Sequence, residues 1–172
     1  MQALHDWHEF YVLLGTSSAA LVALLFVAIS IGVGFFTHRN QAGTRTFTSP
    51  VIVHFSAILF ISAIAIAPAH GPVTLIALIA AGATGVVVSA VTTRHVFDFI
   101  GDSLVESIDQ YAYGFIPLAA YCGIVASGVL LAVHWEWAPE LLAGSTLVHM
   151  MVNIRNAWDL MLSVVRRQAR RD

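Results

Sequence analysis

The chain has 172 residues, of which 58% are hydrophobic and only 10% are charged. A soluble domain has about 25% charged residues, so this composition predicts a membrane protein. All eight basic residues are arginines and ten residues are acidic, which gives a formal net charge of −2. This balance leaves no basic excess for a phosphate backbone, and we expect no binding to nucleic acid.

Missing residue types exclude several classes of enzyme. Because the sequence has no lysine, it can form no Schiff base with retinal or pyridoxal phosphate and no phosphate-binding loop that depends on lysine. Its single cysteine, Cys122, excludes an internal disulfide, a redox pair of cysteines, a thiolate-held iron–sulfur cluster and covalently attached haem. We therefore expect a protein that is not an enzyme.

Five apolar stretches follow one another along the chain, each long enough for the about 20 residues that a helix needs to cross a bilayer. They cover residues 10–36, 50–69, 72–93, 114–134 and 140–165. Pro50, Pro72 and Pro139 lie at or beside the starts of these stretches, where a helix does not need the missing N–H group. The sequence predicts an all-α fold, a polytopic transmembrane helix bundle of five spans in one domain over residues 1–172. An alternative has four spans and a last helix that lies flat on the membrane.

The eight arginines all lie on one side of the five-span arrangement. They are Arg39, Arg45, Arg94, Arg155, Arg166, Arg167, Arg170 and Arg171. Because basic segments stay in the cytoplasm, we expect the N-terminus outside, the C-terminus inside and residues 166–172 as a basic cytoplasmic tail. Trp7, Trp135 and Trp137 then lie at the outer interface, where tryptophan is favoured.

Small residues recur at steps of four in three of the stretches, and such ladders let helices approach closely. The members are Gly15, Ala19 and Ala23, then Ala77, Ala81, Gly85, Ser89 and Thr93, then Ala119, Gly123 and Ser127. The ladders indicate either packing within one protomer or an interface between subunits of a homo-oligomer.

The fifth stretch carries the most polar side chains. Ser145, His149, Asn153 and Asn156 are spaced by four, four and three residues, so they lie along one helix face. Polar groups are costly in a bilayer, and this face must turn inward or toward water. His54, in the second stretch, can reach the depth of Asn153.

Arg155 and Asp159 lie on an adjoining face, four residues apart, and can form an ion pair. Two interpretations of these seven polar residues remain open. They form interhelical hydrogen bonds with a locking ion pair, or they form a polar lining for a proton, an ion or a small solute.

The segment 94–112, after the third stretch, is predicted to prolong that helix into the cytoplasm as an amphipathic helix. One side of it is acidic and carries Asp98, Asp102, Glu106 and Asp109. This acidic face is either a solvated surface, or a vestibule that concentrates cations or docks a partner.

Histidines at the expected outer surface suggest a metal site. His5, His8 and Glu9 are close in sequence, and the topology brings His70 and His134 to the same side. These side chains could bind zinc or copper, and His70 with His134 could bind haem b. The alternative is a set of ordinary interface histidines beside tryptophans.

Two segments carry a resemblance to a known family. They are His-Asp-Trp-His-Glu-Phe-Tyr-Val-Leu-Leu-Gly at 5–15 and Ile-Arg-Asn-Ala-Trp-Asp-Leu at 154–160. With them, most of the chain resembles a family of small uncharacterised bacterial integral membrane proteins. The resemblance implies a location in the bacterial inner membrane, and it implies no activity, substrate or site.

The sequence thus favours a homo-oligomeric channel or transporter-like bundle for a small cation, a proton or a solute. Two other functions stay open. One is an accessory subunit of a larger membrane complex, and the other is a metal- or haem-binding protein for electron transfer or sensing.

Overall fold

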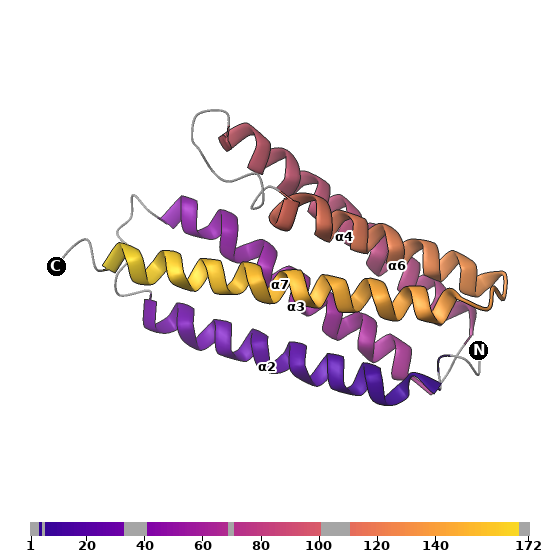
Figure 1. Cartoon of the computed structure of the whole chain (residues 1–172). Helices are drawn as coiled ribbons and strands as arrows, with labels where there is room; N and C mark the ends of the chain where they lie inside the picture. Colours follow the sequence, from indigo (N-terminus) through magenta and orange to yellow (C-terminus); the bar gives the residue numbers. More distant parts are fainter. Residues whose placement is uncertain (1–3, 5, 33–40, 69–70, 101–110, 169–172) are drawn as a thin grey trace.

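The computed structural model describes residues 4, 6–32, 41–68, 71–100 and 111–168, and within these it leaves out the side chains at 31–32, 41–49, 95–100, 111–112 and 163–168. The described chain is helical throughout, apart from short turns (Figure 1). This confirms the all-α fold class. A bilayer offers no water to bond backbone groups, and a helix satisfies them within one segment. This explains why so apolar a chain folds into helices.

Five α-helices and one π-helical turn make up the described part of the chain. They are α2 (His8–Gly32), α3 (Gln41–Ile66), α4 (Pro72–Ile100), η2 (Tyr111–Phe115), α6 (Ile116–Ala132) and α7 (Ala138–Gln168). Successive α-helices run in opposite directions along the bundle (Figure 1). We name the two ends of the bundle after residues of α7: the Glu140 end, where α2, α4 and α7 begin, and the Asp159 end, where α3 and α6 begin.

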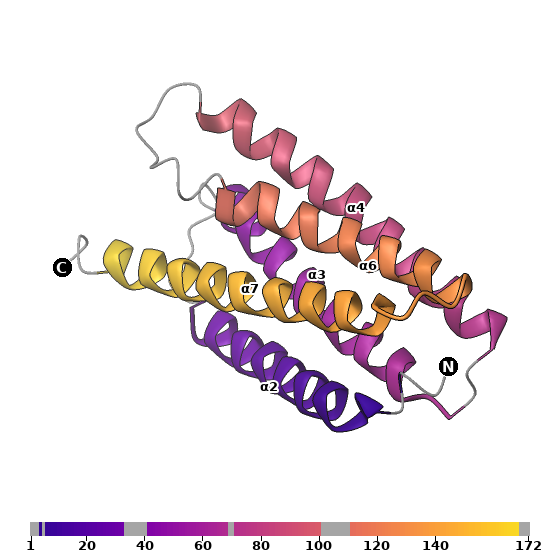
Figure 2. The same ribbon diagram turned by 45° about the vertical axis from the view of Figure 1, so that its right-hand side comes forward.

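The helices α3 and α7 lie in the middle of the bundle. In both views, the pair α4 and α6 lies on one side of them and α2 lies on the other (Figures 1 and 2). Helix α3 contacts α2, α4 and α7, and α7 contacts α2, α3 and α6. Because α7 runs alongside its neighbours over its length, the side chains on its inner face are buried by the bundle.

Three helices of the described chain are long and apolar enough to cross a membrane. They comprise His8–Ser30, Pro72–Arg94 and Tyr113–Ala132, and a shorter apolar helical segment covers Pro50–Ile66. These helices support the prediction of a membrane protein built as a helix bundle.

Pro72 and Pro139 lie in the first turns of α4 and α7, as predicted. The prediction for Pro50 is wrong, because α3 begins at Gln41 and Pro50 lies inside it. The apolar run begins at Pro50, so hydropathy gave no sign of the polar helical segment before it. Inside a helix, proline removes one backbone hydrogen bond and crowds the preceding turn.

Helix α4 continues to Ile100, beyond the predicted end of the third span and into the segment 94–112 that was expected to prolong it.

Glycines of the predicted ladders pack inside the protomer. A Cβ on Gly85 of α4 would overlap the ring of Tyr121 on α6, and one on Gly123 of α6 would overlap Ser145 of α7. Gly15 of α2 faces Ser62 of α3, whose Cβ is 3.1 Å from the ideal Cβ position. By contrast, Ala19, Ala23 and Ala119 are exposed on the outside of the protomer. The glycines therefore serve packing within one chain.

The close approach of α4 and α6 predicts that Gly85→Ala is destabilising. The added methyl must displace the buried Tyr121 ring, at a cost of about 1–3 kcal/mol in the free energy of unfolding. Gly144→Ala is the matched control, since no atom lies within 4 Å of its ideal Cβ. Thermal unfolding in detergent, followed by circular dichroism, measures both variants. Equal stability of the two variants would contradict this packing.

Candidate buried polar site

Four polar residues of α7 follow its buried face. Thr146, His149, Asn153 and Asn156 are spaced by three, four and three residues and are at most 2% exposed. This spacing keeps side chains on one face of a helix. The bundle therefore contains a polar stripe within its interior, along α7.

His149 meets two other polar rings at the centre of the bundle. The ring centroid of His149 lies 4.4 Å from that of Tyr121 on α6 and 4.9 Å from that of His54 on α3. His54 Nδ1 and the Tyr121 hydroxyl share a hydrogen bond of 3.0 Å. All three side chains are at most 2% exposed. We call His54, Tyr121 and His149 the central cluster.

The central cluster forms because Tyr121 can lie flat against α4. Gly85 leaves the space that the phenol ring occupies, so α6 approaches α4 closely and the ring points inward. Tyr121 then reaches across to His54 with its hydroxyl. A tyrosine that is buried with its hydroxyl paired in this way contributes both packing and polar specificity.

Two further hydrogen bonds fix α3 against its other neighbours. Ser18 of α2 donates to the carbonyl of Phe55 at 2.6 Å, and the Asn153 amide of α7 donates to the carbonyl of Val51 at 3.1 Å. Together with the bond between His54 and Tyr121, they join α3 to α2, α6 and α7 within about one helical turn. The middle of α3 is therefore the most cross-linked part of the bundle.

Several buried polar atoms of the site have no hydrogen-bond partner in the described part of the chain. They include both ring nitrogens of His149 and Oδ1 of Asn153. A neutral imidazole has one N–H donor and one acceptor nitrogen, and leaving them unpaired in an apolar interior is costly. His149 therefore has an unused donor and an unused acceptor within the described chain.

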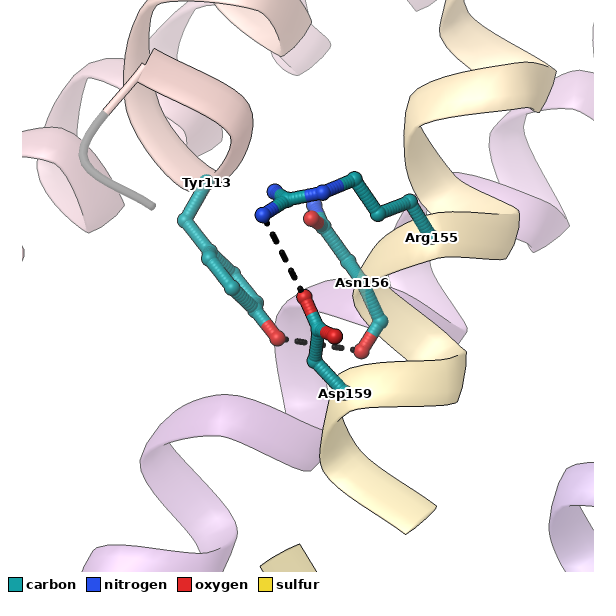
Figure 3. Close-up of polar contacts among 4 residues, drawn as sticks. All are labelled: Tyr113, Arg155, Asn156 and Asp159. Atoms are coloured by element: carbon teal, nitrogen blue, oxygen red, sulfur yellow. Dashed lines mark hydrogen bonds and ion pairs between the residues drawn. The ribbon is translucent and has the colours of Figure 1, made fainter. Parts of the chain in front are cut away.

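A second group of polar contacts lies at the Asp159 end (Figure 3). The Tyr113 hydroxyl of η2 donates to the backbone carbonyl of Asn156 at 3.0 Å. Arg155 and Asp159 form the predicted ion pair, with 3.7 Å between Nη2 and Oδ2. Their side chains are 39% and 36% exposed. The polar stripe of α7 thus ends at charged groups that solvent can reach.

The structure brings together His54, His149, Asn153 and Asn156 of the predicted lining, and it places Ser145 elsewhere. Ser145 packs against Gly123 of α6, and its neighbour Thr146 occupies the buried stripe instead. The predicted face placed Ser145 four residues before His149, whereas the buried stripe has a step of three there, to Thr146. Sequence reasoning also missed Tyr121, although its place amid the small residues of α6 offered a signal.

The other predicted sites lie largely outside the described residues. Asp98 belongs to α4, but its side chain is not described, and Asp102, Glu106 and Asp109 lie outside the described chain, as do His5 and His70. His8, Glu9 and His134 are exposed. Over the residues that the structure describes, no three histidine, cysteine or acidic side chains gather as a metal site. Binding of zinc, copper or haem b, which involves His5 or His70, stays a prediction.

Comparison with models of protein families, with curated proteins and with solved structures gives no match for this chain. Its function must therefore be argued from the buried polar site itself.

The hydrogen bond of the central cluster predicts that Tyr121→Phe lowers stability. The substitution keeps the ring against Gly85 and removes only the partner of His54, and such interhelical bonds contribute about 0.6–1.7 kcal/mol in membrane proteins. Cys122→Ser is the matched control, because Cys122 is the next residue of α6 and is exposed. The free energy of unfolding in detergent micelles measures both. A Tyr121→Phe protein as stable as its control would contradict the bond.

Proposed function

We propose that this protein transfers protons across a membrane through the interior of a single protomer, along the buried face of α7. One observation carries the proposal. His54, Tyr121 and His149 come from three helices, are buried together, and leave both ring nitrogens of His149 without a partner among the described residues. Histidine is the side chain best suited to gain and lose a proton near neutral pH.

The chemistry of the central cluster favours a proton over a hydrated metal cation. Calcium takes six to eight oxygen ligands, and magnesium keeps several of its waters. The cluster instead consists of two imidazoles and a phenol, with ring centroids 4.4–5.6 Å apart. A proton needs no such cage, because it passes between neighbouring donors and acceptors. The same cluster therefore discriminates against larger ions by its close packing.

The α7 stripe supplies a continuation toward the Asp159 end. Asn153 and Asn156 follow His149, and the partly exposed Asp159 carboxylate lies ten residues from His149, which is about 15 Å along a helix. Asn side chains offer both a donor and an acceptor, and a carboxylate can exchange protons with water. Asp159 is the group that releases protons to solvent at this end.

We infer that α7 crosses the membrane as the fifth span. Glu140 and Asp159 lie 19 residues apart in sequence, which corresponds to about 28 Å of helix and agrees with a hydrocarbon core of about 30 Å. Arg94 and Arg155 both belong to the Asp159 end, so the positive-inside rule assigns this end to the cytoplasm. The family resemblance assigns the membrane as the bacterial inner membrane. A homo-oligomer or a larger complex stays a prediction, and the proposed pathway requires neither.

The proposal predicts that His149→Leu abolishes proton flux and that Asn153→Leu lowers it strongly. Leucine has neither a donor nor an acceptor, so each substitution interrupts the stripe. The measurement uses proteoliposomes with a trapped pH-sensitive dye, a potassium gradient and valinomycin. Val148→Leu is the control, because Val148 is the preceding residue of α7 and is exposed.

Gel filtration and thermal unfolding show whether each variant remains folded. Proton flux in folded His149→Leu protein at the level of the Val148→Leu control would overturn the proposed pathway. Wild-type protein that carries no protons under these conditions would overturn it as well.

A further inference from the structure

We propose that Tyr11 and Ser62 hold a chain of water molecules that forms the Glu140-end half of the pathway, and that Glu140 exchanges its protons with solvent. This inference rests on the proposed proton transfer, and it assigns the ligand of a second buried polar site. The ligand is water, together with the protons that it carries. The site lies between α2, α3 and α7, on the opposite side of the central cluster from Asn153.

Tyr11 is a fully buried residue of α2 with an unused polar group. Its side chain is 0% exposed and belongs to the same buried core as Ile61, Leu142 and Tyr121. Its hydroxyl has no hydrogen-bond partner within the described residues. A buried tyrosine usually pairs its hydroxyl, as Tyr121 does, so an unpaired one inside a membrane bundle requires an explanation.

Ser62 provides a second unused hydroxyl on the facing helix. It is 1% exposed and lies eight residues after His54 on α3, that is, two turns closer to the Glu140 end. Its Cβ packs against Gly15, which lies one turn after Tyr11 on α2. Ser62 therefore lies at the interface of α2 and α3, about one turn along α2 from the backbone of Tyr11.

Within the described chain, the buried hydroxyls without a partner are those of Tyr11, Ser62 and Ser89. Thr16, Ser30 and Thr84 are exposed on the outside of the bundle, and each donates to a carbonyl one turn earlier in its own helix. Serine and threonine side chains in apolar helices commonly satisfy themselves in this way. The same bond was open to Ser62, whose Oγ is instead left without a partner. A hydroxyl that forgoes this bond is available to bind water.

Glu140 completes the site on the solvent side. It lies in the first turn of α7 and is exposed, at the same end of the bundle as Tyr11, which lies in the first turn of α2. From Glu140, the buried face of α7 continues through Thr146 to His149. The order of groups is therefore a solvent-exposed carboxylate, two hydroxyls that bind water, and the unpaired imidazole of the central cluster.

The transfer is balanced in protons and needs no other reactant. The Glu140 carboxylate takes a proton from solvent and passes it to the water held by Tyr11 and Ser62. Each water of the chain accepts one proton from the Glu140 side and passes one on, and the last water gives a proton to the acceptor nitrogen of His149. His149 then releases its other ring proton toward Asn153, which leaves the opposite neutral tautomer, and a flip of the imidazole ring restores the initial state.

The hydroxyls are tested by Tyr11→Phe and Ser62→Ala. Each variant keeps the packing atoms, including the Cβ of Ser62 against Gly15, and removes only an unpaired hydroxyl. We expect proton flux to fall by about a hundredfold or more, the low end of what a positioned proton-transfer group contributes. If the hydroxyls only fill space, both variants will keep wild-type flux and melt at the same or a higher temperature, because an unsatisfied buried group has been removed.

The carboxylate is tested by Glu140→Gln, with Glu136→Gln as the matched control. Glu136 is exposed and lies in the turn between α6 and α7, only four residues earlier. We expect flux to fall in Glu140→Gln by about a hundredfold, as for the hydroxyl variants, and to stay unchanged in Glu136→Gln. Equal flux in both variants would remove Glu140 from the pathway.

Access of water to Ser62 gives an independent test in a folded protein. Ser62→Cys in a Cys122→Ser background places a single thiol in the site, and silver ions reach a thiol only through water. We expect silver added from the Glu140 side to inhibit flux, and the Cys122→Ser protein to be insensitive. Insensitivity of both would contradict the water chain.

Failure of this inference and failure of the proposed function have different signatures. If His149→Leu abolishes flux while Tyr11→Phe, Ser62→Ala and Glu140→Gln carry protons normally, the water chain is wrong and the central cluster stands. If the wild-type protein carries no protons, the proposed function itself is overturned, and this inference with it.

Discussion

Polar side chains inside a membrane bundle must find hydrogen-bond partners on their own helix, on neighbouring helices or in buried water, and this constraint organises the described part of the molecule. Helix α3 satisfies this constraint within about one turn. Its carbonyls accept hydrogen bonds from Ser18 and Asn153, and His54 forms a hydrogen bond with Tyr121. These bonds hold four of the five described α-helices together. They also fix the position at which α7 passes α3, because Asn153 can reach Val51 in only one register.

The same geometry that stabilises the bundle leaves groups available for chemistry. Gly85 allows Tyr121 to reach His54, and the two rings enclose His149 on α7. The cluster is thus assembled by packing, while His149 itself forms no hydrogen bond within the described chain. A purely structural histidine in such a place would be expected to have a partner. The unsatisfied imidazole is therefore the feature on which the proposed proton transfer depends.

The sequence predicts the larger features of this fold well and its interior only in part. Apolar length located α2, α4 and α6, because the bilayer fixes how many residues a span needs. The start of α3 was missed, since the polar helix before Pro50 has no hydropathy signal. His54, His149 and Asn153 were found because polar residues in apolar spans are conspicuous. Tyr121 was missed, because an aromatic residue in such a span resembles one that faces lipid, and its inward direction depends on the contact with Gly85.

The central claim is that protons from water reach His149 inside the folded bundle. Solid-state NMR of protein with ¹⁵N-labelled histidine in bilayers tests it directly, because it detects transfer of magnetisation from water to the ring nitrogens. The His149 signal is assigned by comparison with a His149→Asn sample. The exposed His8 and His134 provide internal references. The account predicts transfer from water to His149 on the same timescale as to these references. A His149 ring that receives no magnetisation from water, while His8 and His134 do, would contradict it.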